Sequence, residues 1–462
     1  MMKRTGTVVV FFCMVGSVWS AQKRIAPSSG AGEKPVTAQI QKAVDDLSQS
    51  GGGTVLLEKG TYVAGSIILK SGVTLRLEKG AVILGSTNYS DYAATPSHGR
   101  SLIYAEDAEN VALEGKGVID GRGYTFTRKD GAPHRPKNAL FFRCKKVRVE
   151  GVTLKNAGSW TCHFRECDGV IAKKVTISGH ANFNNDGFDI DSRNVEISDC
   201  VIDSDDDAIC FKSDNPAFIV ENATVRNCKV SSNCNFIKFG TSCFGGFRNI
   251  TVRDCDLFHC SKSILRHWEN QKLPGVTDPI TGLDGIALEV VDGGFMENVC
   301  VSNITMRDVQ TPILIRLARR HASPGSYLKN ILIQNVKGSS SSLIASSITG
   351  VPGLRVEHVV LKDIALNLKA GGKAADTLVE IPEKEQSYPE NRMFDKLMLP
   401  AYGFYIRHAD NIRMENVKLT FSGGREERHA IVADDVNNVQ FVNCAFQKPD
   451  GTLGTFSGVS GK

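Results

Sequence analysis

The chain has little net charge for its length. Its 462 residues include 55 Lys and Arg against 50 Asp and Glu, which leaves a formal net charge of +5 at pH 7. No block of basic residues stands out, whereas binding to nucleic acid usually depends on such a block. The composition therefore predicts no nucleic-acid partner.

Long apolar runs are also scarce. One occupies residues 7–15, where it follows Lys3 and Arg4 and is followed by small residues ahead of Ala21. A short basic start, an apolar run and a small-residue cleavage site are typical of a secretory signal. We therefore expect residues 1–20 to be a signal peptide and the mature chain to be exported, to the periplasm or outside the cell. No later run is long and apolar enough to predict a membrane span.

Histidine and cysteine show no spacing of the kind that binds metals, so we expect no metal and no other cofactor. Cysteines in an exported chain favour disulfides. However, Cys200, Cys228 and Cys255 follow similar strand-like segments at separations of 28 and 27 residues. Thiols at equivalent positions of a repeat stack as small apolar fillers. The spacing argues against a full disulfide framework, while one or two disulfides stay open.

Helical periodicity is missing after residue 60, which excludes a doubly wound α/β sheet. The Leu-x-x-Leu-x-Leu frame of leucine-rich repeats is missing too. Instead, short strands rich in Val and Ile recur, mostly every 23 to 31 residues. This repeat predicts an all-β fold, a right-handed parallel β-helix that forms a single domain over residues 21–462.

Several of the repeated strands run into a turn asparagine: Asn227, Asn303, Asn335, Asn416 and Asn443. Asparagine tolerates left-handed backbone geometry and hydrogen-bonds to neighbouring backbone. Because these positions recur at the repeat length, their amides are expected to stack and to bond to one another.

One helix is expected near the start of the chain. Residues 36–48 place Ile40, Ala43, Val44 and Leu47 on one face, and a glycine triplet follows. A helix at this place would cap the open N-terminal end of the solenoid, whose first coil is otherwise an unpaired edge.

Insertions interrupt the repeat in three places: 122–138, 268–285 and 370–403. Loops on such a scaffold usually wall a binding groove. The third insertion contains the aromatic residues Tyr388, Tyr402 and Phe404. These aromatic residues could stack on sugar rings or pack the loop onto the solenoid, and the sequence does not decide between the two roles.

Eight aspartates lie between residues 186 and 207. Asp186 precedes Asp206 by 20 residues, about one coil, so the two segments are expected to stack one strand spacing apart, roughly 4.8 Å. Crowded carboxyl groups cannot all ionise easily, so one pKa rises while others stay low. That split suits acid/base cleavage of an acetal. The spacing alone also leaves a calcium site or solvated turn residues open.

Two segments of this cluster resemble the catalytic signature of the polygalacturonase family of glycoside hydrolases, family 28. They are residues 184–189, Asn-Asn-Asp-Gly-Phe-Asp, and residues 206–209, Asp-Asp-Ala-Ile. The likeness covers most of the mature chain, and it implies an inverting hydrolase on a parallel β-helix. Carried over by position, it implies Asp206 as the general acid. Asp186 and Asp207 would then position and deprotonate the attacking water.

Two other motifs of that family are altered here. Asn235 stands where the family has a histidine within Gly-His-Gly. Where Arg-Ile-Lys is expected, the best match is Ala-Leu-Glu ending at Glu289, so the basic pair that would hold a galacturonate carboxylate is absent. Lys238 and Arg316 could restore positive charge from neighbouring coils. The residues expected to bind substrate are Asn184, Asn235, Lys238, Glu289 and Arg316.

Three functions follow from these observations. The favoured one is an inverting glycoside hydrolase of a pectin-related polysaccharide or oligosaccharide, with a galacturonide or rhamnogalacturonan-type linkage rather than unbranched polygalacturonate. The second is a polysaccharide lyase on the same scaffold, which would use an Arg or Lys base with calcium. The third is a non-catalytic glycan-binding β-helix.

Overall fold

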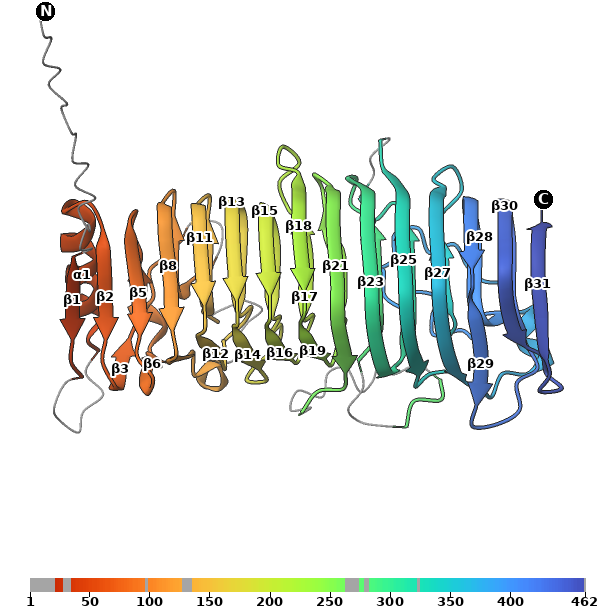
Figure 1. Cartoon of the computed structure of the whole chain (residues 1–462), viewed down its shortest axis with the longest axis horizontal. Coiled ribbons are helices and arrows are strands. Elements are labelled where there is room, and N and C mark those ends of the chain that lie inside the picture. The colour runs from red at the N-terminus through yellow and green to blue at the C-terminus, as the bar shows by residue number, and fades with distance from the viewer. Residues whose placement is uncertain are drawn as a thin grey trace, which may run out of the picture.

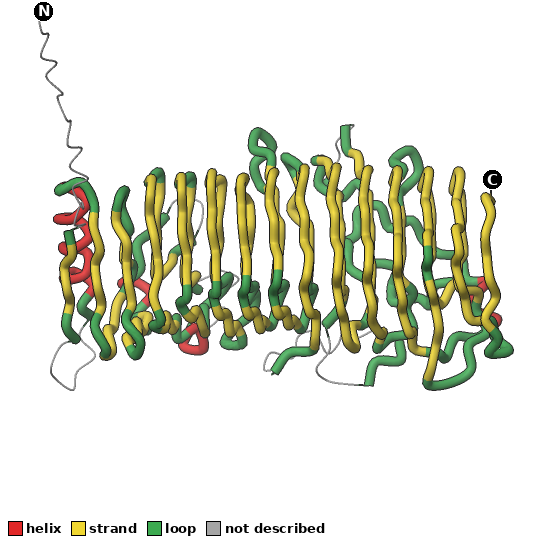
Figure 2. The backbone as a smooth tube through the Cα atoms, in the orientation of Figure 1, coloured by secondary structure: helices red, strands yellow, loops and turns green. Residues whose placement is uncertain are grey.

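The strands of the chain form one continuous parallel sheet, wound into a right-handed solenoid (Figures 1 and 2). This computed structural model describes residues 21–27, 35–95, 99–126, 135–261, 274–277, 282–321 and 325–460. The predicted fold class is confirmed. The predicted signal peptide lies outside the described residues, as do parts of the insertions expected at 122–138 and 268–285. The division at residue 20 therefore stays a prediction.

The N-terminal end of the solenoid is capped as predicted. Strand β1 (Gln22–Ile25) pairs with β2, and helix α1 (Thr37–Gln49) lies beside them (Figure 1). The helix buries the four residues that the periodicity places on one face: Ile40, Ala43, Val44 and Leu47. Among the described residues, no helix has the length and apolar character needed to cross a membrane.

Each coil contributes strands to three rows that run along the solenoid axis. The first row holds the long strands in front in Figure 1. Its members are β2 (Gly53–Leu57), β5 (Val73–Leu77), β8 (Glu109–Gly115), β11 (Lys145–Glu150), the second half of β13 (Cys162–Lys173), the second half of β15 (Phe188–Ser198), β18 (Val220–Arg226), β21 (Phe247–Phe258), β23 (Phe295–Val309), β25 (Tyr327–Ser340), β27 (Val356–Lys369), β28 (Ala401–Glu415) and β30 (His429–Gln447). Antiparallel β31 (Leu453–Ser460) covers the last coil.

The second row consists of short strands. They are β3 (Gly60–Ala64), β6 (Ala81–Gly85), β9 (Val118–Asp120), β12 (Thr153–Lys155), β14 (Thr176–Gly179), β16 (Val201–Ser204), β19 (Lys229–Ser232) and β29 (Lys418–Ser422). Between β19 and β29 the ends of the long strands β21 to β27 continue this row.

The third row carries the candidate site. Its strands are β4 (Ile67–Ile68), β7 (Ser101–Glu106), β10 (Lys137–Phe142), the first halves of β13 and β15, β17 (Ile209–Ser213), β20 (Ile237–Cys243), β22 (Asp284–Val290), β24 (Thr311–Leu317), β26 (Ser346–Thr349) and the first halves of β28 and β30. In the described part of the chain, three 3-10 helices lie in the connections: Tyr89–Asp91, Gly123–Thr125 and Ala374–Leu378.

Stacked side chains fill the interior because equivalent residues repeat from coil to coil. Phe141, Phe164 and Phe188 stack in sequence, with ring centroids 5.6 and 6.2 Å apart. Further along, the rings of Phe211 and Phe239 stack at 4.5 Å. One core cluster of this kind extends along the solenoid from the first coil to the last.

The predicted asparagine ladder is confirmed for two pairs, whereas Asn227 donates to Asp199 instead. Asn335 donates from its side-chain amide to Asn303 at 2.8 Å, and Asn443 donates to Asn416 at the same distance. All four residues have φ between 50 and 55°, in the left-handed region that asparagine tolerates.

The cysteines behave as the repeat predicted. Cys200, Cys228 and Cys255 are at most 2% exposed at equivalent places of successive coils. Every cysteine of the described residues carries a free thiol. The stacked thiols therefore act as core filler.

The third predicted insertion is a loop of residues 370–400, between β27 and β28, which we call the covering loop. Ile381, Met393 and Phe394 of this loop pack on Ala287 and Leu314, on the outer side of the third row. Of the three aromatic residues, Tyr402 and Phe404 belong to β28 and are buried there. Only Tyr388 lies exposed in the loop, at 49%. The loop thus covers the third row on the C-terminal side of the aspartates.

Candidate active site

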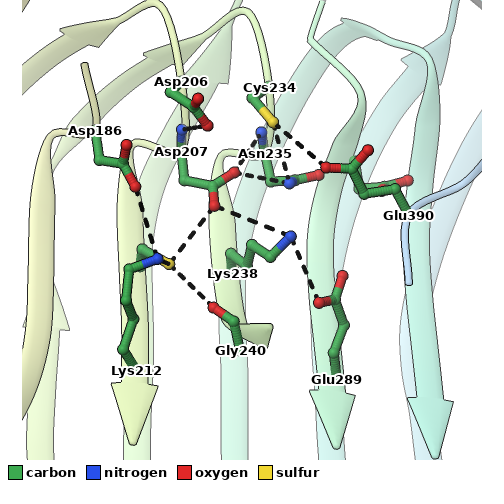
Figure 3. Close-up of polar contacts among 12 residues, drawn as sticks. Asp186, Asp206, Asp207, Lys212, Cys234, Asn235, Lys238, Gly240, Glu289 and Glu390 are labelled. Atoms are coloured by element: carbon green, nitrogen blue, oxygen red, sulfur yellow. Dashed lines mark hydrogen bonds and ion pairs between the residues drawn. The ribbon is translucent and has the colours of Figure 1, made fainter. Parts of the chain in front are cut away.

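The two aspartate segments stack on neighbouring coils, as their spacing predicted. Strands β15 and β17 pair in parallel with Phe188 opposite Ile209. Just before these strands, the backbone N–H of Gly187 donates to the carbonyl of Asp207 at 2.8 Å. Asp186 and the Asp206–Asp207 pair therefore converge from adjacent turns that enter the third row (Figure 3).

Asp206 lies in a position that favours its protonated form. Its carboxyl group accepts hydrogen bonds from the Asn184 side chain at 3.4 Å and from the backbone N–H of Asp207 at 2.9 Å. These bonds favour the ionised form, but burial and the neighbouring charge of Asp207 outweigh them and raise the pKa of Asp206 to about 7. A carboxyl group that keeps its proton near neutral pH can protonate a leaving oxygen.

Asp207 is the ionised partner. Burial alone would raise its pKa, but the ammonium groups of Lys238 and Lys212 outweigh burial and hold the pKa below its usual range. Asn235 also stabilises the charge, because both its side-chain amide and its backbone N–H donate to one carboxylate oxygen, at 2.7 and 3.2 Å. Neighbouring Asp206 and Asp207 thus have their pKa values pushed in opposite directions, which separates acid from base.

Asp186 supplies the second carboxyl group near the water site. An oxygen of Asp186 and one of Asp207 lie within 4.8 Å of each other, so one water molecule can bond to both. Burial, together with the charges of Asp189 and Asp206, raises the pKa of Asp186 well above its usual value. In the free protein, Asp207 is therefore the stronger candidate for accepting a proton, and Asp186 for positioning the water.

Lys212 was not predicted from the sequence, yet it lies at the centre of the site. Its ammonium group is 3.6 Å from Asp186 (Figure 3). It also lies 3.4 Å from Asp189 and 4.9 Å from the ring centroid of Trp160. The sequence feature that could have identified Lys212 is the alternation of side chains along β17. Ile209 and Phe211 point into the core, so Lys212 points outward, toward the carboxylates.

The three aspartates were also a candidate calcium site. Their oxygen atoms and a nearby sulfur could contact a cation, but the ammonium groups of two lysines already supply positive charge next to them. Asp186, Asp207 and Cys210 place ligand atoms within 4.8 Å of one another. Lys212 and Lys238 would repel a calcium ion at this position. The geometry therefore favours acid/base chemistry over calcium binding at the three aspartates.

The residues predicted to bind substrate lie in different places. Asn184 is exposed and bridges Asp206 to Arg135, whose guanidinium donates to the Asn184 oxygen at 3.0 Å. Asn235 is completely buried behind Asp207. Its contacts make it a positioning residue for the Asp207 carboxylate, while contact with substrate stays a prediction for Asn184.

Lys238 and Glu289 form a buried pair, with Lys238 Nζ 3.5 Å from Glu289 and 3.9 Å from Asp207 (Figure 3). Both side chains have no exposed surface. Burial raises the pKa of Glu289 well above its usual value. The covering loop closes this position, since the Lys238 ammonium lies 5.3 Å from the ring centroid of Tyr388.

Arg316 is held by the covering loop. Its guanidinium donates to the backbone carbonyls of Glu383 and Lys384 at 2.7 and 3.2 Å, and to Gly350 at 3.1 Å. These bonds anchor the loop to β24. Substrate binding by Arg316 stays a prediction that would require the loop to move.

Glu390 of the covering loop is a further residue that the sequence did not reveal. It is 1% exposed, pairs with Arg392, and lies 3.9 Å from the sulfur of Cys234 (Figure 3). Its charge adds to the rise in the pKa of Asp206. No local pattern could have found it, because 183 residues separate it from Asp207 and only the docked loop brings it near.

Comparisons with known proteins point to a family of glycoside hydrolases. The model of the family "Glycosyl hydrolases family 28" matches residues 54–232, which include all three aspartates. A probable polygalacturonase of Vitis vinifera is 23% identical, over 74% of this chain and 73% of its own. An exopolygalacturonase of Platanus acerifolia is 24% identical, over 76% of this chain and 91% of its own.

A solved structure shows the same fold. The hyperthermoactive exopolygalacturonase of Thermotoga maritima superposes with a TM-score of 0.64 at 20% identity, over 87% of this chain and 92% of its own. At this identity, the likeness speaks for the parallel β-helix alone.

Proposed function

The chain belongs to the polygalacturonase-like glycoside hydrolases of family 28, and we propose that it cleaves pectin-related glycosides with inversion, close to chain ends. Hydrolysis of glycosidic bonds in a pectin-related substrate follows from the family. The opposite pKa shifts of Asp206 and Asp207 carry the proposal of mechanism. The covering loop carries the proposal of chain-end action.

The proposed reaction uses each carboxyl group once. Asp206 donates its proton to the glycosidic oxygen as the bond to the anomeric carbon breaks. A water molecule held between Asp186 and Asp207 attacks that carbon from the opposite face, and Asp207 accepts a proton from it. The positive charge that develops on the sugar is stabilised by the carboxylate of Asp207.

Inversion can be measured directly. Because water, and not a carboxylate, attacks the anomeric carbon, the first product should have the anomeric configuration opposite to that of the substrate linkage. Proton NMR during the first minutes of hydrolysis, before mutarotation, distinguishes the two anomers. A product of retained configuration would contradict the mechanism, and an unsaturated sugar would favour the lyase.

The covering loop supports action near chain ends. Its tip is firmly docked, since the backbone N–H of Asn391 donates to Asp284 at 3.3 Å and Arg407 donates to the carbonyl of Ile381 at 2.7 Å. Tyr388 and Glu390 lie over the coils that directly follow Asp207. A long chain therefore has no open path along the third row in that direction.

The same loop supports weak activity on unbranched polygalacturonate. Lys238 is buried against Glu289, and Arg316 is bonded to loop carbonyls, so neither is free to meet a uronate carboxylate. A missing charge-assisted hydrogen bond costs about 1.5–3 kcal/mol, or roughly 10- to 150-fold in kcat/KM. Lys212 is also engaged, because its ammonium group lies 3.4 Å from Asp189 and 3.6 Å from Asp186.

We expect kcat/KM on unbranched polygalacturonate to be at least about tenfold lower than on the best pectic oligosaccharide or branched pectic fragment. Initial rates across such a panel, with neutral glycans included, test this preference. Products separated by size should be short from the start of the reaction. The Asp206→Asn variant, prepared in the same way, controls for contaminating activity. Rapid random cleavage of polygalacturonate would show that the covering loop does not block the chain.

A further inference from the structure

A second group of metal-ligand side chains lies beside the catalytic turn, in the second row. Three residues that are distant in sequence converge there: His180 after β14, Asp203 in β16 and Cys260 after β21. One ring nitrogen, one carboxylate oxygen and the sulfur all lie within 4.8 Å of one another. We call these three residues the His180 cluster.

The histidine of this cluster is deeply buried between two carboxylate groups. His180 is 3% exposed, and neither of its ring nitrogens has a hydrogen bond of acceptable geometry within the described residues. Yet Nε2 lies 3.0 Å from an Asp203 oxygen, and Nδ1 lies 3.6 Å from Asp205. A buried ring nitrogen, a carboxylate oxygen and a thiol sulfur that lie this close together form a donor set that zinc sites use.

Asp205 lies beside the second ring nitrogen of the proposed metal-bound histidine, 3.6 Å away and so just beyond hydrogen-bond distance. Such a histidine usually directs one nitrogen to the metal and the other to a carboxylate that fixes the ring. Here Nε2 faces Asp203, while Nδ1 faces Asp205. Asp205 is itself held, because the side-chain amide of Asn233 donates to it at 2.6 Å.

We propose that His180, Asp203 and Cys260 bind one divalent transition-metal cation of the zinc type, with Asp205 orienting the histidine. A mixed set of nitrogen, oxygen and sulfur ligands suits zinc and disfavours calcium or magnesium, which prefer oxygen alone. The Asp203 side chain is 21% exposed, so the cation can enter there and a water molecule can fill the fourth position.

This site lies apart from the reacting atoms but close to the turn that carries them. Ser204 follows Asp203, and its hydroxyl donates to the backbone carbonyl of Asp206 at 2.9 Å. The cation would tie the end of β21 to this turn through Cys260. Its role would be to hold the Asp206–Asp207 turn in place, without contact to substrate.

Metal binding must release protons. The thiol of Cys260 donates to the carbonyl of Ser204 at 3.1 Å, and it has to lose its proton to become a ligand. His180 has to be neutral at Nε2. The affinity for zinc should therefore rise with pH.

The experiment uses the full-length protein. After treatment with a chelator and removal of the chelator, zinc is titrated in competition with a chromophoric chelator, and cobalt(II) is titrated with an absorption readout. We expect one site per chain, a higher thermal midpoint with zinc, and a cobalt–thiolate charge-transfer band. Calcium should give none of these. If the wild-type protein binds no metal in these titrations, the proposal is overturned. The cluster would then be a charged histidine paired with two carboxylates.

Variants separate ligands from the supporting carboxylate. Cys260→Ser should abolish the cobalt–thiolate band, and His180→Gln should weaken zinc binding by more than about 100-fold. Asp205→Asn should weaken it by about 10- to 100-fold, as expected for a group that acts through the histidine. The matched control is Cys300→Ser, which removes a half-buried thiol outside the His180 cluster. This variant should bind zinc like the wild type. Unchanged zinc affinity in Cys260→Ser and His180→Gln would refute the assignment. Should these variants fail to fold, the wild-type cobalt spectrum still decides.

Discussion

Replacing Asp206 by asparagine is expected to lower kcat by at least about three orders of magnitude, while the free energy of unfolding at neutral pH should be no lower than that of the wild type. Loss of a general acid typically costs about 10²–10⁴ in rate. Stability should survive because the pKa of Asp206 is raised to about 7, so the folded protein favours the neutral form of the carboxyl group below that pH. Asparagine has the size of that form and carries no charge.

The pH dependence of stability gives this prediction a second measurement. The folded-state pKa of about 7 lies above the unfolded value of about 3.9. Such a group contributes stability that is fully present below the unfolded value and is lost as pH rises through about 7. Between about pH 4 and 7, the free energy of unfolding, measured with urea, should therefore decrease less in the Asp206→Asn variant than in the wild type. A variant with more than a tenth of the wild-type kcat would show that Asp206 is not the acid.

Much of the fold could be predicted because the repeat is visible in local sequence. The Val- and Ile-rich strands, the turn asparagines and the Cys200, Cys228 and Cys255 spacing each repeat once per coil, so each observation supports the same architecture. The capping helix could also be predicted from local sequence, because its four buried residues are spaced with helical periodicity.

The aspartates could be predicted to meet because their separation is close to one coil. Asp186 and Asp207 come from adjacent turns, and a parallel ladder brings such turns together. Their pKa values could not be assigned from sequence, because the opposite shifts depend on Lys212 and Lys238 and on burial.

The surroundings of the site could not be predicted because they come from distant segments. Arg316 belongs to the third row, as its strand pattern indicates, but its guanidinium meets the backbone of the covering loop. The same loop brings Glu390 near Asp206. The His180 cluster also joins three coils at turn positions, where neither strand alternation nor a metal-binding spacing marks it.

Asp207→Asn should separate the two neighbouring aspartates most sharply. We expect kcat to fall by about 10²–10⁴, because the group that accepts a proton from water is lost. Stability should fall as well, by about 1–3 kcal/mol, because a buried charge partner is removed. The loss should stay below the roughly 3–5 kcal/mol of a fully broken buried pair, since Asp189, whose pKa is raised only to about 6, still lies 3.4 Å from Lys212 as a charged partner.

The sign of the pH effect is opposite for the two residues. The folded-state pKa of Asp207 is depressed by Lys238 and Lys212, which outweigh burial. Its contribution to stability is therefore present above the unfolded value of about 3.9 and is lost as pH falls through the lower folded value. Urea unfolding of Asp206→Asn and Asp207→Asn at about pH 7 compares two carboxyl-to-amide changes one residue apart. Equal stability losses would mean that the charges of the pair are assigned wrongly, and with them the roles of acid and base.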